Sequence, residues 1–136
     1  MDKVILISHG RLAEEMKKSV EMIIGKKENI YACGLLETEN ITQFELKLKE
    51  IVDTFETNHT VFIFADLYGG SPCNTCIKAY MESSNIEVIS GMNMAMIVSV
   101  MLEQGHDAQT LIHIGKESII NVKKKYLDMS VLEADE

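Results

Sequence analysis

Short apolar runs alternate with longer amphipathic stretches along most of this chain, and no other feature limits the possible fold as strongly. The apolar runs have the length of buried strands and lie at residues 4–7, 30–35, 61–65 and 86–90. The stretches between them place apolar residues at helical spacing, as Leu12, Met16 and Val20 do. Strands that alternate with helices of ten or more residues indicate βαβ units. We therefore expect an α/β fold with an open, doubly wound sheet of four parallel strands.

Several polar residues mark where the expected helices begin. Asn40 is followed three residues later by Gln43, the pattern of a capping box. Ser71 is expected to cap the next helix, with Pro72 as its first residue. Asp107 is expected to cap a later helix. Residues 119–126 alternate weakly between apolar and polar side chains, which predicts a C-terminal edge strand.

Length and charge restrict the class of protein. The chain has 136 residues, which predicts one domain over residues 1–136. A net charge of −8 argues against a nucleic-acid partner, because phosphate backbones are bound by clustered Lys and Arg. The sequence shows no pattern of a signal peptide or a membrane span. We therefore expect a cytoplasmic protein whose three cysteines stay reduced.

The expected topology points to one edge of the sheet as the functional site. Ligands of open α/β sheets bind beyond the carboxyl ends of the strands, where the strand order reverses. In the common order 2-1-3-4 this point lies between the first and third strands. His9 follows the first strand and Asp66 follows the third. A carboxylate that accepts from the Nδ1–H of a histidine fixes its tautomer and leaves Nε2 free as a nucleophile.

A glycine-rich loop beside this pair suits an anion. Gly69 and Gly70 allow close approach of the backbone, and N–H groups around Gly70 and Ser71 at a helix start favour negative charge. Each feature alone is common in purely structural turns. Their coincidence favours phosphoryl transfer through a phosphohistidine on His9, with no metal and no cofactor required.

Three motifs carry a resemblance to a known family. They are Ser8-His9-Gly10, the stretch Asp66-Leu67-Tyr68-Gly69-Gly70-Ser71-Pro72-Cys73-Asn74, and Gly91-Met92-Asn93-Met94-Ala95-Met96. In these motifs, and over most of its length, the chain resembles the mannose-class (mannose/fructose/sorbose) IIA components of the bacterial sugar phosphotransferase system.

The resemblance implies a role, partners and an assembly. His9 would accept phosphate on Nε2 from the histidine phosphocarrier protein and pass it to a IIB component, which serves the membrane IIC and IID components during phosphoenolpyruvate-dependent sugar uptake. Asp66 would be the acid that bonds His9, and Gly70 and Ser71 would form the phosphate-binding loop. The chain would act as a cytoplasmic phosphotransferase, transiently associated with the membrane permease complex. It would form a homodimer in which residues 119–126 are exchanged as an antiparallel strand.

Some residues near these motifs permit other interpretations. Arg11, Leu67, Tyr68 and Met92 are candidates for docking a partner protein. Cys73 and Cys76 form a C-x-x-C pattern, which raises thiol–disulfide chemistry, although small packed helix residues explain it as well. Two other functions stay open: a small tetrapyrrole metal chelatase, and the phosphotransfer subunit of a dihydroxyacetone kinase system.

Overall fold

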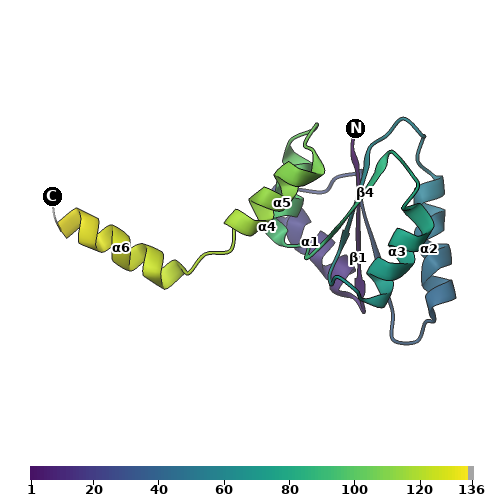
Figure 1. Ribbon diagram of the computed structural model, residues 1–136, viewed down its shortest axis with the longest axis horizontal. Coiled ribbons are helices and arrows are strands. Elements are labelled where there is room, and N and C mark those ends of the chain that lie inside the picture. The colour runs from purple at the N-terminus through teal and green to yellow at the C-terminus, as the bar shows by residue number, and fades with distance from the viewer. Residues whose placement is uncertain (135–136) are drawn as a thin grey trace.

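A parallel sheet forms the centre of the computed structural model, which describes residues 1–134 (Figure 1). Its strands are β1 (Lys3–His9), β2 (Ile30–Leu35), β3 (Val61–Ala65) and β4 (Ile86–Ser90). Their order is β2-β1-β3-β4 and every neighbouring pair is parallel. The predicted sheet and its strand order are thus confirmed.

Helices cover both faces of the sheet because neighbouring side chains of each strand point to opposite faces. In β1, Val4 and Leu6 pack into one core cluster, whereas Ile5 and Ile7 pack into another. The first cluster lies against α1 (Leu12–Ile24), α4 (Met94–Leu102) and α5 (Ala108–Glu117). The second lies against α2 (Ile41–Asp53) and α3 (Ser71–Tyr80). Figure 1 shows these two helical layers on either side of the strands.

Two of the three predicted helix caps are confirmed. Asn40 and Gln43 form the complete capping box of α2, and the Asp107 side chain accepts from the N–H of Thr110 at the start of α5. The prediction for α3 is wrong by one residue. Gly70 is the N-cap, Ser71 is the first helical residue and Pro72 the second. Proline is tolerated there because the first N–H groups of a helix have no intrahelical acceptor.

The open edge of β2 is closed at one residue by two side chains. The carbonyls of Asn29 and Leu35 accept from the N–H groups of Val4 and Gly10. In a parallel pair, alternate residues bond to the same neighbour, so the backbone N–H and C=O groups of Ile30, Ala32 and Gly34 point away from β1. The N–H of Gly34 donates to Glu14 Oε1 of α1 at 2.6 Å. The carbonyl of Gly34 accepts from Lys47 Nζ of α2 at 2.8 Å. Both helical layers therefore bind the same edge residue.

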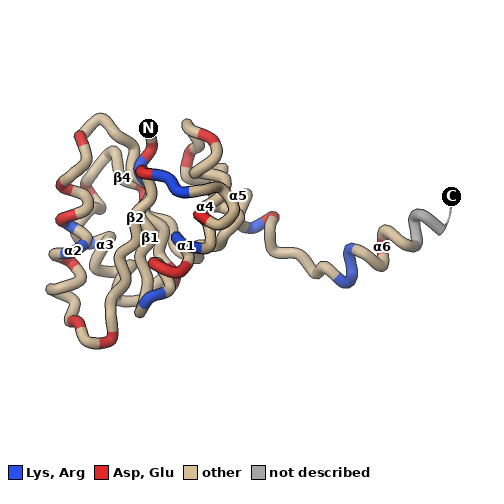
Figure 2. Tube along the Cα trace, turned by 180° about the vertical axis from the view of Figure 1, so that it is seen from behind, with Lys and Arg blue, Asp and Glu red and all other residues tan. Residues whose placement is uncertain are grey.

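The prediction of a strand at residues 119–126 is wrong. Helix α6 begins at Val122 and runs to Ala134. The Asn121 side chain accepts from the N–H of Lys124 at 3.0 Å and so caps it. Figures 1 and 2 show α6 projecting away from the sheet, so no strand edge lies beside it for pairing. A segment in that position satisfies its backbone groups through its own helical hydrogen bonds. Among residues 1–134, no helix is long and apolar enough to cross a membrane.

Candidate functional site

The topology brings His9 and Asp66 into direct contact. His9 is the last residue of β1, and Asp66 follows β3, the strand that pairs with β1. Asp66 Oδ2 lies 2.8 Å from His9 Nδ1 and also accepts from the His9 backbone N–H at 2.9 Å. One carboxylate oxygen therefore fixes both the main chain and the ring of His9.

This contact determines which ring nitrogen is available for chemistry. An ionised carboxylate can only accept hydrogen bonds, so Nδ1 of His9 must carry a proton. In the neutral ring Nε2 then holds a free electron pair. A positive charge that develops on the ring is stabilised by the same carboxylate. The arrangement leaves Nε2 as the ring nitrogen whose electron pair is free.

The start of α3 lies directly against the ring of His9. A Cβ atom placed on Gly70 would stand 2.6 Å from Cε1 and 3.3 Å from Nε2 of His9. The N–H of Gly70 donates to the Leu67 carbonyl at 3.2 Å, which closes a turn. As the first residue of α3, Ser71 presents an N–H without an intrahelical acceptor. A group bound to Nε2 would therefore sit beside the positive end of the α3 dipole.

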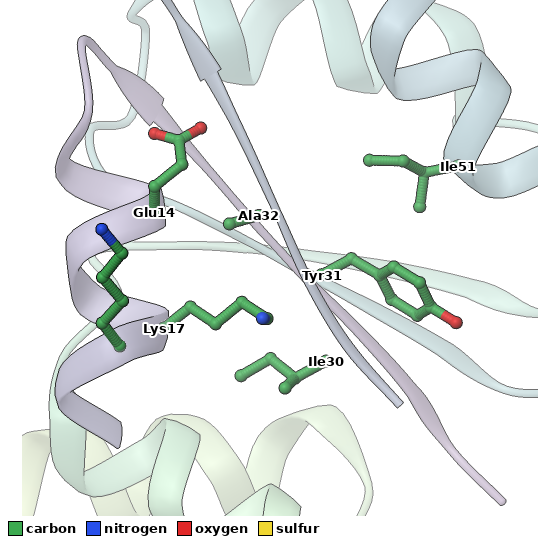
Figure 3. A pocket seen from close by; sticks show the side chains of 7 residues that line it. Glu14, Lys17, Ile30, Tyr31, Ala32 and Ile51 are labelled. Carbon is green, nitrogen blue, oxygen red and sulfur yellow. The ribbon is translucent and has the colours of Figure 1, made fainter. Parts of the chain in front are cut away.

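His9 is accessible to a large partner rather than enclosed. Its side chain is 49% exposed, whereas that of Asp66 is 12% exposed. A hollow of about 460 Å³ lies elsewhere, along the open edge of β2. Figure 3 shows Glu14 and Lys17 on one side of that hollow and Tyr31 and Ile51 on the other. A half-exposed imidazole at a strand end is accessible to a side chain of another protein.

The predicted docking residues have different environments. Leu67 and Tyr68 are 60% and 84% exposed in the loop between Asp66 and Gly70. Arg11 is exposed at the N-cap of α1, and its side chain does not cap the helix. Met92 is partly buried against the core cluster of α4 and α5. The loop between β3 and α3 thus presents exposed apolar side chains in the segment that leads to Gly70, which lies against His9.

The three cysteines are buried in the core between the sheet and the layer of α2 and α3. Burial raises the pKa of the Cys76 thiol to about 12 and that of Cys33 to about 11. Thiols that stay protonated are poor nucleophiles. The packing interpretation of Cys76 is therefore favoured over thiol chemistry. Among residues 1–134, no three His, Cys, Asp or Glu side chains are placed to hold a metal ion together.

Comparison with known proteins identifies the family. The family model described as "PTS system fructose IIA component" matches residues 3–114, which include the whole sheet and the site. The chain belongs to this family. The comparisons favour neither the chelatase nor the dihydroxyacetone kinase alternative.

Relatives of the IIA family come from several bacteria. The chain is 26% identical over 128 residues to the mannose-specific EIIAB component of Escherichia coli, matching 90% of this chain and 40% of that protein. It therefore spans less than half the length of that relative. It is 31% identical over 104 residues to the sorbose-specific EIIA component of Klebsiella pneumoniae, covering 76% of each. A IIA protein associated with the fucose utilization operon of Streptococcus pneumoniae has a TM-score of 0.86 at 25% identity, covering 92% of this chain and 96% of that one.

The structure also shows contacts of this IIA chain that the sequence did not reveal. Ser8 is fully buried, and its hydroxyl accepts from the N–H of Ala13 at 2.7 Å, which ties α1 to the end of β1. Asn74 Nδ2 donates to the Gly69 carbonyl at 3.0 Å. In the sequence, Ser8 and Asn74 belong to the motifs around His9 and Asp66, but nothing there predicts these two hydrogen bonds. Neither spacing matches a standard capping pattern.

Proposed function

We propose that this IIA chain is a phosphoryl carrier that uses His9. It accepts a phosphoryl group on Nε2 from the phosphohistidine of the histidine phosphocarrier protein. It then passes the group to a histidine of a IIB component during sugar uptake. The contact of 2.8 Å between His9 Nδ1 and Asp66 Oδ2 carries this proposal, because it leaves Nε2 free on a side chain that is half exposed.

The transfer needs few participants. The electron pair of Nε2 attacks the phosphorus of the incoming phosphohistidine, and a new N–P bond forms. The N–P bond of the donor breaks, and the donor imidazole leaves with the electron pair. The proton on Nδ1 of His9 stays in place, and Asp66 offsets the positive charge of the phosphorylated ring. The N–H of Ser71 and the start of α3 provide a favourable field for the phosphoryl oxygens.

The proposal includes a location and an assembly. The carrier acts in the cytoplasm, docks through Leu67 and Tyr68, and associates transiently with the membrane IIC and IID components through IIB. It works as a homodimer, supported by the projecting C-terminal arm with its exposed apolar side chains (Ile119, Ile120, Val122, Tyr126, Leu127 and Met129). Light scattering should give the mass of a dimer for the full chain and of a monomer for a chain that ends at Ser118. If the full chain and the shortened chain have the same oligomeric state, the proposed role of the arm in the dimer is contradicted.

The mass of the intact protein tests the carrier role directly. We would incubate the chain with phosphoenolpyruvate, enzyme I and the histidine phosphocarrier protein, beside a His9→Ala variant. The proposal expects one acid-labile phosphoryl group on the wild type and none on the variant. If the wild type stays unmodified while the phosphocarrier becomes charged, the proposal is wrong.

A further inference from the structure

The loop that faces His9 contains two adjacent glycines, and a side chain from the following helix restrains it. Gly69 adopts φ 81°, a conformation that glycine allows without strain. The Leu67 carbonyl accepts from the Gly70 N–H across this residue, so the loop closes as a tight turn. A turn with two consecutive glycines has little intrinsic preference for one peptide orientation. The Leu67 carbonyl holds the N–H side of the Gly69–Gly70 peptide, so a second contact has to hold its carbonyl side.

Asn74 supplies that contact. Its Nδ2 donates to the Gly69 carbonyl at 3.0 Å, and its backbone N–H donates to the Gly70 carbonyl at 2.9 Å. Two successive carbonyls are therefore bound to one residue of α3. Because the peptide unit is planar and trans, fixing the Gly69 carbonyl also fixes the direction of the Gly70 N–H.

The fixed peptide lies where its position matters for His9. The Cα of Gly70 stands close enough to the imidazole that an added Cβ would overlap Cε1. Gly70 is also the N-cap of α3, so its conformation sets the direction of the Ser71 N–H. A change in the Gly69–Gly70 peptide would move both the backbone that lies against His9 and the first N–H group of α3.

We propose that Asn74 is a positioning residue for phosphoryl transfer, which acts by holding the Gly69–Gly70 peptide against His9. This inference rests on the proposed function. Asn74 is exposed and makes its side-chain hydrogen bond to a loop carbonyl, so it is free of the packed core. Asn74 fixes the loop that would face the phosphoryl group, whereas Asp66 fixes the imidazole ring of His9.

The experiment compares two asparagines that make the same kind of bond at opposite ends of the sheet. Asn85 Nδ2 donates to the His59 carbonyl at 2.9 Å, before the amino end of β4. Asn74→Ala and Asn85→Ala each remove one bond from an amide to a carbonyl. We would measure single-turnover transfer from the phosphorylated phosphocarrier at saturating donor, the lifetime of the phosphorylated protein, and the amide shift of Ser71 on phosphorylation.

The expected result separates positioning from stability. Asn74→Ala should lower the maximal transfer rate about 10-fold or more, because small displacements of reacting groups are costly. It should also shorten the lifetime of the phosphorylated form and reduce the Ser71 shift, while Asn85→Ala leaves all three unchanged. Asn74→Asp, which keeps the shape but cannot donate when ionised, should behave as Asn74→Ala does. If both Asn74 variants match Asn85→Ala, the inference is overturned. If the wild type takes up no phosphate at all, the proposed function itself has failed.

Discussion

A single methyl group on Gly70 should disable the site while leaving the fold intact. Gly70 has φ −76° and ψ 161°, an extended conformation that alanine adopts without strain. The Gly70→Ala variant therefore meets no backbone penalty of its own. Its added Cβ would stand 2.6 Å from His9 Cε1, where ordinary contacts begin at 3.4 Å. The overlap lies between the methyl group and the ring.

The size of the effect follows from this overlap. Relief of the contact requires a displacement of about 0.8 Å, shared by the ring and the α3 start. If the ring takes up about half of this displacement along the bond, the Nδ1–Oδ2 distance lengthens from 2.8 Å to about 3.2 Å, which weakens the hydrogen bond that orients the ring. Misplacement of reacting groups by about 1 Å can cost about 100-fold in rate. We expect the same order of loss in transfer to His9, equivalent to about 2.7 kcal/mol of activation free energy.

Rapid-quench measurement of transfer from the phosphorylated phosphocarrier tests this reasoning. The Gly25→Ala variant is the control, because Gly25 lies at the end of α1 with φ 84° and open space around it. Gly25→Ala should lower the free energy of unfolding without changing the transfer rate. Gly70→Ala should lower the transfer rate without changing the free energy of unfolding. A transfer rate for Gly70→Ala within threefold of the wild type would refute the steric argument.

Three further predictions concern charge, pH and capping. Asp66→Asn should reduce phosphoryl acceptance by about 10²-fold or more in the same transfer assay, because the amide no longer fixes the tautomer or offsets the ring's charge. Urea denaturation under reducing conditions should show a stability that falls as the pH rises above about 9. The unfolded thiols lose protons near pH 9, whereas burial raises the pKa of Cys33 to about 11 and that of Cys76 to about 12 in the folded protein. Between these pH values each thiol lowers the free energy of unfolding by about 1.4 kcal/mol per pH unit. A Cys33→Ala, Cys76→Ala double variant should lose most of this pH dependence. Asn40→Ala should cost about 1 kcal/mol of unfolding free energy by breaking the capping box, with an unchanged transfer rate, and an unaltered denaturation midpoint would contradict it.

The sheet was predictable because its signals are local. Residues 30–35, 61–65 and 86–90 are short, mainly apolar runs, and the structure gives strands with the same limits. The first strand extends beyond the apolar run at both ends, from Lys3 to His9, because hydrogen bonding to β2 and β3 continues past the buried residues. Once the strand order is assumed, the meeting of His9 and Asp66 follows from parallel connectivity alone.

The failures of prediction involve choices that a single sequence pattern leaves undetermined. Ser71 and Gly70 are both acceptable N-caps, and Pro72 fits the first or the second helical position, so the pattern allowed either boundary. In residues 119–126 the weak alternation is compatible with a strand only if another edge is beside it. The capping side chain of Asn121 instead begins a helix there. The contact of Gly70 with the His9 ring depends on side-chain geometry in three dimensions, which no sequence spacing encodes.

The two hydrogen bonds at Gly34 have a consequence for self-association. An unpaired strand edge is a template on which another chain can add a strand. Glu14 and Lys47 occupy the outward N–H and carbonyl of Gly34, which leaves only Ile30 and Ala32 of β2 with outward groups. An added strand could therefore pair only along the first part of β2, since the last outward residue already has both of its backbone groups bound. The oppositely charged pair thus shortens the edge on which another copy of the protein could add a strand.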